Sequence, residues 1–191
     1  MSLPSIGQAK MLADHFELLI KRNSPASVAI IGCAGGNGLD RIAPGQVERI
    51  VAVDINPNYV EEARTRYASR LGCLEVICGD VQAESLHFEP VDLIYAALIF
   101  EYVDISSTFA TLRRHCRSGG TLATLLQLPH ANQNGVTPSP YESLQALAPI
   151  LRLRTPAELQ QLAAAAGFPT PESETIALPS GKEFCLQTFR S

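Results

Sequence analysis

The hydrophobic and polar positions of this chain follow two patterns, one typical of buried strands and one typical of amphipathic helices. Short apolar runs such as residues 28–31 suit strands that are buried on both faces of a parallel sheet. Apolar residues at helical spacing lie between these runs, so strands and helices alternate along the chain. The strands that the pattern predicts lie at residues 28–31, 49–53, 74–78, 91–96 and 121–128.

The expected helices begin at recognisable capping residues. Asn56 can cap a helix with Pro57 in its first turn, and Asp104 can cap the next one. Thr155 and Glu158 have the spacing of a capping box. Three further boundaries follow from spacing and turn residues: an N-terminal helix that breaks at 23–25, a helix directly after residue 38, and a turn at 118–120 that ends the helix begun by Asp104.

This order of elements predicts an α/β fold. We expect a three-layer sandwich around a seven-stranded, mainly parallel sheet, because five strand–helix units precede a hairpin at 174–178 and 183–189. That hairpin would bring one antiparallel strand into the sheet. The 191 residues fit one domain, 1–191, in which the proline-rich stretch 129–153 is an insertion on the substrate side.

The composition of the chain limits the kinds of partner that we expect. The formal net charge is −4 and no Lys/Arg run occurs, so we expect no nucleic-acid partner. The longest apolar run, residues 93–100, is too short to span a bilayer, and no basic segment precedes an apolar one at the start. Five cysteines without a C-x-x-C pair are typical of reduced thiols. We therefore expect a cytoplasmic protein without a metal site or a membrane partner.

The glycine-rich stretch after the first strand is the main candidate for a ligand-binding site. Gly32 and Gly36 lack a Cβ where the backbone must turn sharply and a ligand must approach, which favours a nucleotide-like ligand. Asp54 ends the neighbouring strand, 22 residues after Gly32, where a carboxylate can bind a ribose diol. A helix cap or an exposed strand end is the alternative for Asp54. Asp80, after the third strand, is either a ligand contact or a turn former.

Taken in order, these motifs resemble the class I S-adenosylmethionine-dependent methyltransferases, a Rossmann-like family. The residues that carry the resemblance are 31–36 (IGCAGG), 51–57 (VAVDINP), 78–81 (CGDV), 91–103, 118–121 (SGGT) and 155–168. The resemblance implies an S-adenosylmethionine site in which Asp54 binds the ribose and Asp80 the adenine amino group. Its full set of cofactor-binding residues would be Gly32, Cys33, Ala34, Gly36, Asp54, Ile55, Asp80, Val81, Ala96 and Ala97.

Two residues depart from the family pattern. Ile30 stands where an acidic residue is common, so a contact to the cofactor's ammonium would be lost or replaced. Ala34 stands where the middle glycine of the turn is usual and adds one methyl group to it.

The expected reaction is in-line displacement of the sulfonium methyl group by a nucleophile. The family has no universal catalytic residue, since a base is needed only when the nucleophile must lose a proton. The candidates are His130, Glu101, Tyr102 and Tyr141. For His130 the alternative is a solvated loop histidine, for Glu101 the start of the next helix, and for Tyr141 an anchor for its loop.

The end of the fourth strand bears on the acceptor. Residues 95–98 (YAAL) lack the Asn/Asp-Pro-Pro-Tyr signature of many nucleic-acid amino-methylases, so we expect a small-molecule acceptor, with a protein side chain as the alternative. Two other functions stay open: a non-catalytic methyltransferase-fold protein that binds a ligand or partner, and an NAD-dependent oxidoreductase. The latter explains Gly79 and Asp80 less well.

Overall fold

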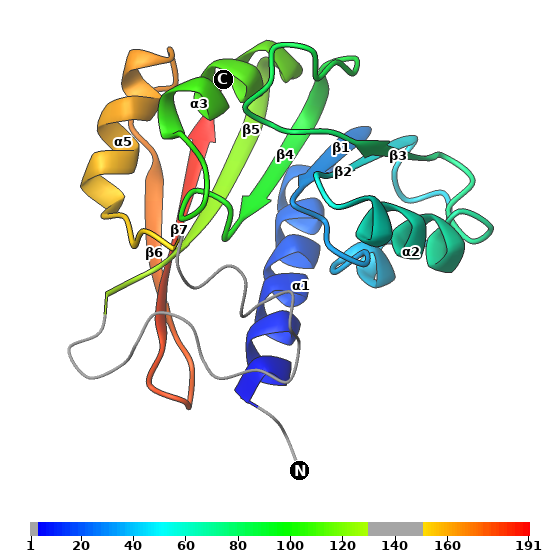
Figure 1. Cartoon of the computed structure of the whole chain (residues 1–191), viewed down its shortest axis with the longest axis horizontal. Coiled ribbons are helices and arrows are strands. Elements are labelled where there is room, and N and C mark those ends of the chain that lie inside the picture. Colours follow the sequence, from blue (N-terminus) through cyan, green and yellow to red (C-terminus); the bar gives the residue numbers. More distant parts are fainter. Residues whose placement is uncertain (1–3, 130–150) are drawn as a thin grey trace.

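A single seven-stranded sheet forms the middle layer of the molecule (Figure 1). The computed structural model describes residues 4–129 and 151–191. In the order β3-β2-β1-β4-β5-β7-β6, β7 runs in the direction opposite to the other six strands. The strands are β1 (Ser27–Ile31), β2 (Arg49–Asp54), β3 (Leu74–Cys78), β4 (Val91–Ala97), β5 (Cys116–Gln127), β6 (Glu172–Ala177) and β7 (Glu183–Arg190). The predicted fold class, including the antiparallel hairpin strand, is confirmed.

Helices cover both faces of this sheet. Adjacent residues of a buried strand point to opposite faces, as Ile30 and Ile31 do. Ile31 packs in the cluster that includes Phe109 and Leu159, whereas Ile30 packs in the cluster that includes Phe16. The helices are α1 (Pro4–Asn23), η1 (Leu39–Arg41) and α2 (Pro57–Tyr67) on the Ile30 side, and α3 (Ile105–His115) and α5 (Pro156–Ala165) on the Ile31 side.

The three predicted caps are confirmed. The side chain of Asn56 accepts a hydrogen bond from the Asn58 N–H (3.0 Å) at the start of α2. Asp104 accepts one from the Ser107 N–H at the start of α3 (2.9 Å). Thr155 accepts one from the Glu158 N–H at the start of α5 (3.1 Å). Each side chain satisfies a donor that the first turn of a helix leaves without a partner.

Two predicted helix boundaries are wrong. The helix expected after residue 38 is only the three-residue 3₁₀ helix η1, because Pro44 and Gly45 follow at once and proline disfavours helical backbone before it. The turn at 118–120 does not end α3, which stops at His115, but lies inside β5. Between the pairs Val91–Cys116 and Leu93–Thr121, β4 advances by two residues and β5 by five. Gly119 (φ 75°) accommodates the extra residues of β5.

Within the described residues, no helix is both long and apolar enough to cross a membrane. All five cysteines are free thiols. The cytoplasmic location stays a prediction.

Candidate functional site

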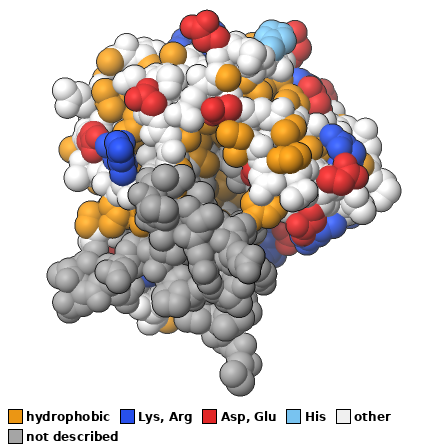
Figure 2. Space-filling model, in the orientation of Figure 1, with side chains coloured by type: hydrophobic (Ala, Val, Ile, Leu, Met, Phe, Trp, Pro, Cys, Tyr) orange, Lys and Arg blue, Asp and Glu red, His pale blue; other side chains and the backbone are white. Residues whose placement is uncertain are grey.

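The carboxyl ends of β1, β2 and β4 meet at one edge of the sheet because these strands are parallel neighbours. Figure 2 shows that this side of the molecule is hollowed near the carboxyl end of β4 and that hydrophobic side chains line the hollow. In sheets of this kind, ligands bind outside the carboxyl ends of the strands. The sequence-predicted cofactor residues come from the loops along this edge.

The glycine turn after β1 is folded against the end of β2. The N–H groups of Gly32 and Cys33 both donate to the carbonyl oxygen of Val53, at 2.9 and 3.1 Å. Gly32 has φ 71°, and a Cβ placed there would lie 2.6 Å from Cγ2 of Ile99. Gly36 has φ 94°, and its Cβ would overlap the ring of Tyr67. These glycines are therefore needed for contacts within the protein, before any ligand is considered.

Asp54 joins the glycine turn to α2. Its Oδ2 accepts a hydrogen bond from the Ala34 N–H at 2.8 Å, and its Oδ1 accepts one from the Asn56 N–H at 2.9 Å. The side chain is nearly buried, at 9% exposed, beside Ile55, which is 65% exposed. Each carboxylate oxygen has a second lone pair, so Asp54 still offers one acceptor on each oxygen to a diol. The residues present thus fit the ribose of the expected cofactor.

Backbone strain is concentrated at the same edge. Ala34 has φ 47° in the glycine turn, and Leu98 has φ 56° directly after β4. Residues other than glycine rarely adopt this left-handed conformation, which costs about 1 to 2 kcal/mol each. Of the three such residues in the described chain, only Ser24 lies elsewhere, at the end of α1.

Asp80 forms the turn that was the alternative to a ligand contact. Its Oδ1 accepts hydrogen bonds from both the backbone N–H and the side-chain amide of Gln82, at 2.9 and 3.2 Å. The Gln82 Oε1 in turn accepts from the Asp104 N–H at 2.8 Å. The loops after β3 and β4 are therefore tied together. A contact from Asp80 or the buried Val81 to adenine stays a prediction.

Glu101 is the catalytic candidate with the most distinctive surroundings. It is 2% exposed, and its Oε1 accepts a hydrogen bond from the Gln127 N–H at 2.8 Å. Burial raises the pKa of this carboxyl group to about 7, although hydrogen bonds from the N–H groups of Gln127 and Glu101 itself oppose the rise. The other oxygen, Oε2, is buried and has no hydrogen-bond partner among the described residues.

Of the remaining predicted site residues, three lie within the described chain and two lie outside it. Ala96 is buried at the end of β4 and Ala97 is half-buried. Tyr102 is half-buried, and burial together with the nearby Glu101 raises the pKa of its hydroxyl group. His130 and Tyr141 lie outside the described residues.

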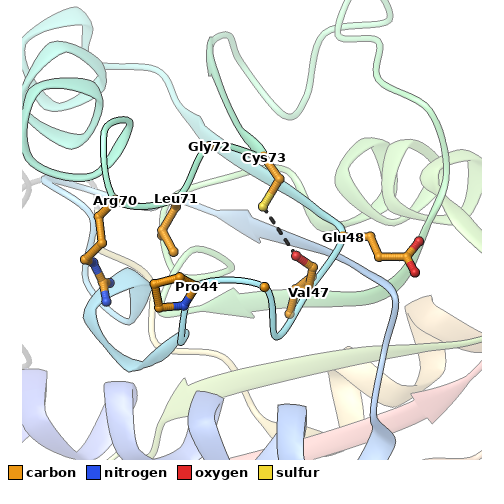
Figure 3. Close-up of a pocket in the computed structure, with 8 residues that line it drawn as sticks. Pro44, Val47, Glu48, Arg70, Leu71, Gly72 and Cys73 are labelled. Carbon is orange, nitrogen blue, oxygen red and sulfur yellow. Dashed lines mark hydrogen bonds between the residues drawn. The ribbon is translucent and has the colours of Figure 1, made fainter.

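A separate pocket of about 340 Å³ lies at the opposite edge, before β2 and β3 (Figure 3). The Arg70 guanidinium there donates to the carbonyl oxygens of Leu39 and Ile42. The Cys73 thiol donates to the Val47 carbonyl, and the Glu48 carboxylate points away. The Arg70 guanidinium and the Cys73 thiol of this pocket are thus already bonded to backbone carbonyl groups of the protein.

Two residues of the site were missed from the sequence. Ile99 fills the space beside Gly32, and Gln82 links two loops, but neither belongs to a short motif. Their roles depend on contacts between distant segments, which spacing along the chain does not reveal. In the described part of the chain, no group of three or more His, Cys, Asp or Glu side chains could hold a metal ion.

Comparisons with known proteins agree with this architecture. Residues 30–124 match a family model described as a methyltransferase domain. A search of curated proteins found no significant match. Among solved structures, the N-methyltransferase NodS from Bradyrhizobium japonicum WM9, in complex with S-adenosylhomocysteine, is 14% identical with a TM-score of 0.72, covering 98% of this chain and 88% of NodS.

Two further structures show the range of this fold. The 1,6-didemethyltoxoflavin-N1-methyltransferase from Burkholderia thailandensis, with 1,6-didemethyltoxoflavin and S-adenosylhomocysteine bound, is 18% identical with a TM-score of 0.67, covering 96% of this chain and 77% of that enzyme. The [4+2]-cyclase SpnF is 13% identical with a TM-score of 0.73, covering 94% and 81%. The shared topology, together with the match over residues 30–124, shows that this chain has the class I methyltransferase fold.

Proposed function

We propose that this protein is an S-adenosylmethionine-dependent methyltransferase that acts on a small-molecule acceptor. The hydrogen bond from the Ala34 N–H to Asp54 supports the proposal, because the carboxylate that would bind the ribose lies beside the glycine turn at one edge. A nucleotide-binding turn and an acidic residue at the end of the neighbouring strand together make a nucleoside site.

Each group of proposed cofactor-binding residues would contact a different part of S-adenosylmethionine. Asp54 would bind the ribose hydroxyls, and the exposed side chain of Ile55 would pack against the adenine. Asp80 and Val81 would line the far end of the adenine site. The glycine turn, with Cys33 and Gly36, and the end of β4 at Ala96 and Ala97 would surround the amino-acid part. When bound, S-adenosylmethionine supplies an activated methyl group, so these residues mainly align it and exclude water.

Ile30 limits what the first strand can contribute. It is 3% exposed and packs in the apolar cluster with Phe16. The side chain at this position therefore offers no hydrogen bond to the cofactor's ammonium group. We expect backbone groups or water to take that role.

The acceptor class rests on composition and on the end of β4. The net charge of −4 and the absence of an Asn/Asp-Pro-Pro-Tyr motif disfavour nucleic acid. In the Burkholderia structure a small molecule and S-adenosylhomocysteine are both bound. We further propose one domain over 1–191 with a substrate-side insertion at 129–153, most of which lies outside the described residues, and a cytoplasmic location.

A protein that binds ligand without transferring a methyl group is the second candidate. The neighbour SpnF, a [4+2]-cyclase, shows that this architecture also occurs in a protein of another reaction class. Ile30 and the strained Ala34 are the residues of this chain that favour the alternative. An NAD-dependent oxidoreductase is the third and least supported candidate.

Isothermal titration separates these functions. We expect the protein to bind S-adenosylmethionine and S-adenosylhomocysteine and not NADH. Binding of NADH alone would replace the proposal by an oxidoreductase. Transfer of radiolabelled methyl from S-adenosylmethionine to a panel of small amines and phenols would then exclude the non-catalytic candidate.

A further inference from the structure

Glu101 ends the hydrogen-bond ladder between β4 and β5. The last pair of that ladder is Ala97 with Leu125, and the Leu98 N–H still donates to the Leu125 carbonyl at 2.8 Å. The chain then turns away at Leu98, which has φ 56°. The pairing of β5 with β4 ends there, and the Gln127 N–H, two residues further along β5, donates to Oε1 of Glu101.

Accepting the hydrogen bond from the Gln127 N–H does not require a charged side chain. One backbone donor needs one acceptor oxygen, and a glutamine side chain would supply it without a charge. The second oxygen of Glu101 is buried and lacks a partner among the described residues. Burying an ionisable group that is not fully hydrogen-bonded is unfavourable, so a bound ligand that donates a hydrogen bond to Oε2 would remove this cost.

The position of Glu101 suits a ligand of the proposed site. The carboxyl group lies between the ends of β4 and β5, and β1 with its glycine turn is the other neighbour of β4. Ile99, in the same loop, contacts Gly32 of that turn. The loop that carries Glu101 therefore borders both the expected cofactor site and the space beyond β5.

The polar and charged residues near Glu101 in the described chain do not donate a hydrogen bond to its Oε2. Tyr102 follows it in the same loop, and the Lys182 ammonium, in the turn between β6 and β7, donates to Oε1 of Gln127 at 3.5 Å. Arg152 contributes its backbone N–H to the Glu101 carbonyl at 2.9 Å. Within the described chain, none of these groups donates a hydrogen bond to Oε2.

We propose that Oε2 of Glu101 accepts a hydrogen bond from the nucleophilic N–H or O–H group of the methyl acceptor and takes its proton during transfer. This inference rests on the proposed function. The acceptor's lone pair forms the new bond to the methyl carbon, and the carbon–sulfur bond breaks with its electron pair left on sulfur. The proton of the acceptor passes to Glu101, which becomes a neutral carboxylic acid and releases the proton to solvent after the product leaves.

The substitution Glu101→Gln tests this role because it keeps the acceptor for the Gln127 N–H and removes the base. Glu84→Gln, the same change at an exposed position, is the matched control. Binding of S-adenosylhomocysteine is measured first by calorimetry. If the unsubstituted protein does not bind it, the proposed function fails, whatever Glu101 does. We expect the affinity of both variants to stay within about twofold, because the cofactor contacts are untouched.

Benzylamine and phenol then serve as separate N–H and O–H probes, added to the complex with S-adenosylhomocysteine. In protein with ¹³C-labelled glutamate, we expect at least one probe to move the side-chain carboxyl signal that is missing from the Glu101→Gln variant. We also expect that variant to bind the same probe about tenfold more weakly or worse, and Glu84→Gln to bind it normally.

Two results would overturn the role of Glu101 while leaving cofactor binding intact. The first is equal probe affinity in Glu101→Gln and the unsubstituted protein. The second is a Glu101 signal that neither probe moves, which would mean that the acceptor does not reach this oxygen. If a probe is methylated, the rate should fall about 10²-fold or more in Glu101→Gln and stay unchanged in Glu84→Gln.

Discussion

The two ends of β4 each have a carboxylate, and the two groups behave in opposite ways. At the amino end, Asp92 accepts hydrogen bonds from the N–H and hydroxyl of Ser27 and from the guanidinium of Arg117, at 2.7–2.9 Å. At the carboxyl end, Oε1 of Glu101 accepts a hydrogen bond from the backbone N–H of Gln127, and its other oxygen has no partner among the described residues. The carboxylate at the amino end is therefore hydrogen-bonded within the protein, whereas the one at the carboxyl end retains an oxygen without a partner in the described chain.

The pKa shifts follow this difference. Burial alone would raise the pKa of Asp92, but the hydrogen bonds from Ser27 and Arg117 outweigh it and lower the pKa. For Glu101, burial outweighs the backbone hydrogen bonds and raises the pKa to about 7. Asp92 therefore stabilises the fold above its ordinary pKa of 3.8 and loses that effect as the pH falls. Glu101 instead destabilises the fold as the pH rises from 4.5 through about 7.

The largest expected effect is on the pH dependence of stability in Glu101→Gln. The two proteins should have similar free energies of unfolding at pH 4, where the Glu101 carboxyl is protonated in the folded chain and mostly protonated in the unfolded chain. At pH 8 the variant should be more stable by about 3 kcal/mol, because it has no buried charge to form. Urea unfolding at both pH values measures this, and equal differences at the two would show that Glu101 titrates normally.

A slightly smaller effect is expected from Asp54→Asn on cofactor binding. The amide can accept on one oxygen only and has no charge, so S-adenosylhomocysteine should bind about 100-fold more weakly, as expected for loss of a hydrogen bond to a charged group. Calorimetry measures the affinity, with Asp40→Asn as an exposed control outside the site. An unchanged affinity in Asp54→Asn would remove Asp54 from the ribose site.

A substitution of Asp92, at the amino end of β4, should change the stability of the protein but not its binding of the cofactor. Asp92→Ala leaves the buried N–H and hydroxyl of Ser27 without their acceptor, at a cost of about 2 kcal/mol in the free energy of unfolding at pH 7. Binding of S-adenosylhomocysteine should stay unchanged, because this edge lies opposite the candidate site. Weaker binding in a folded Asp92→Ala protein would contradict the division between the two edges.

The smallest expected effect is a gain from Ala34→Gly. Glycine adopts φ 47° without strain, which offsets its larger freedom in the unfolded chain and should raise the free energy of unfolding by about 0.5 kcal/mol. Thermal unfolding detects a change of this size. A loss of stability would mean that the methyl group of Ala34 packs favourably where it stands.

Much of the fold could be predicted because its signals are local. The caps at Asn56, Asp104 and Thr155 are read from a few adjacent residues, and all three form the expected hydrogen bonds. The helix after residue 38 failed because the proline and glycine at 44–45 outweigh a short apolar pattern.

The candidate site could be predicted only in part. The sequence predicts Asp54 at the end of the strand next to the glycine turn, where the structure has it bonded to the Ala34 N–H, and its contact with a ribose stays a prediction. The pairing of Ile99 with Gly32 and of Glu101 with Gln127 depends on how β4 turns away from β5. Such contacts join segments whose separation in sequence carries no periodic signal.

The position of β7 between β5 and β6 constrains how the molecule assembles. Within the described chain the strand partner of β6 is β7, which comes later in the sequence, so β6 cannot join the sheet before β7 is made. The β6–β7 pair must then join β5, a strand made about fifty residues earlier. We expect this late, non-local docking to be the slow step of folding, and β5 to be the surface most prone to mispairing until it is complete.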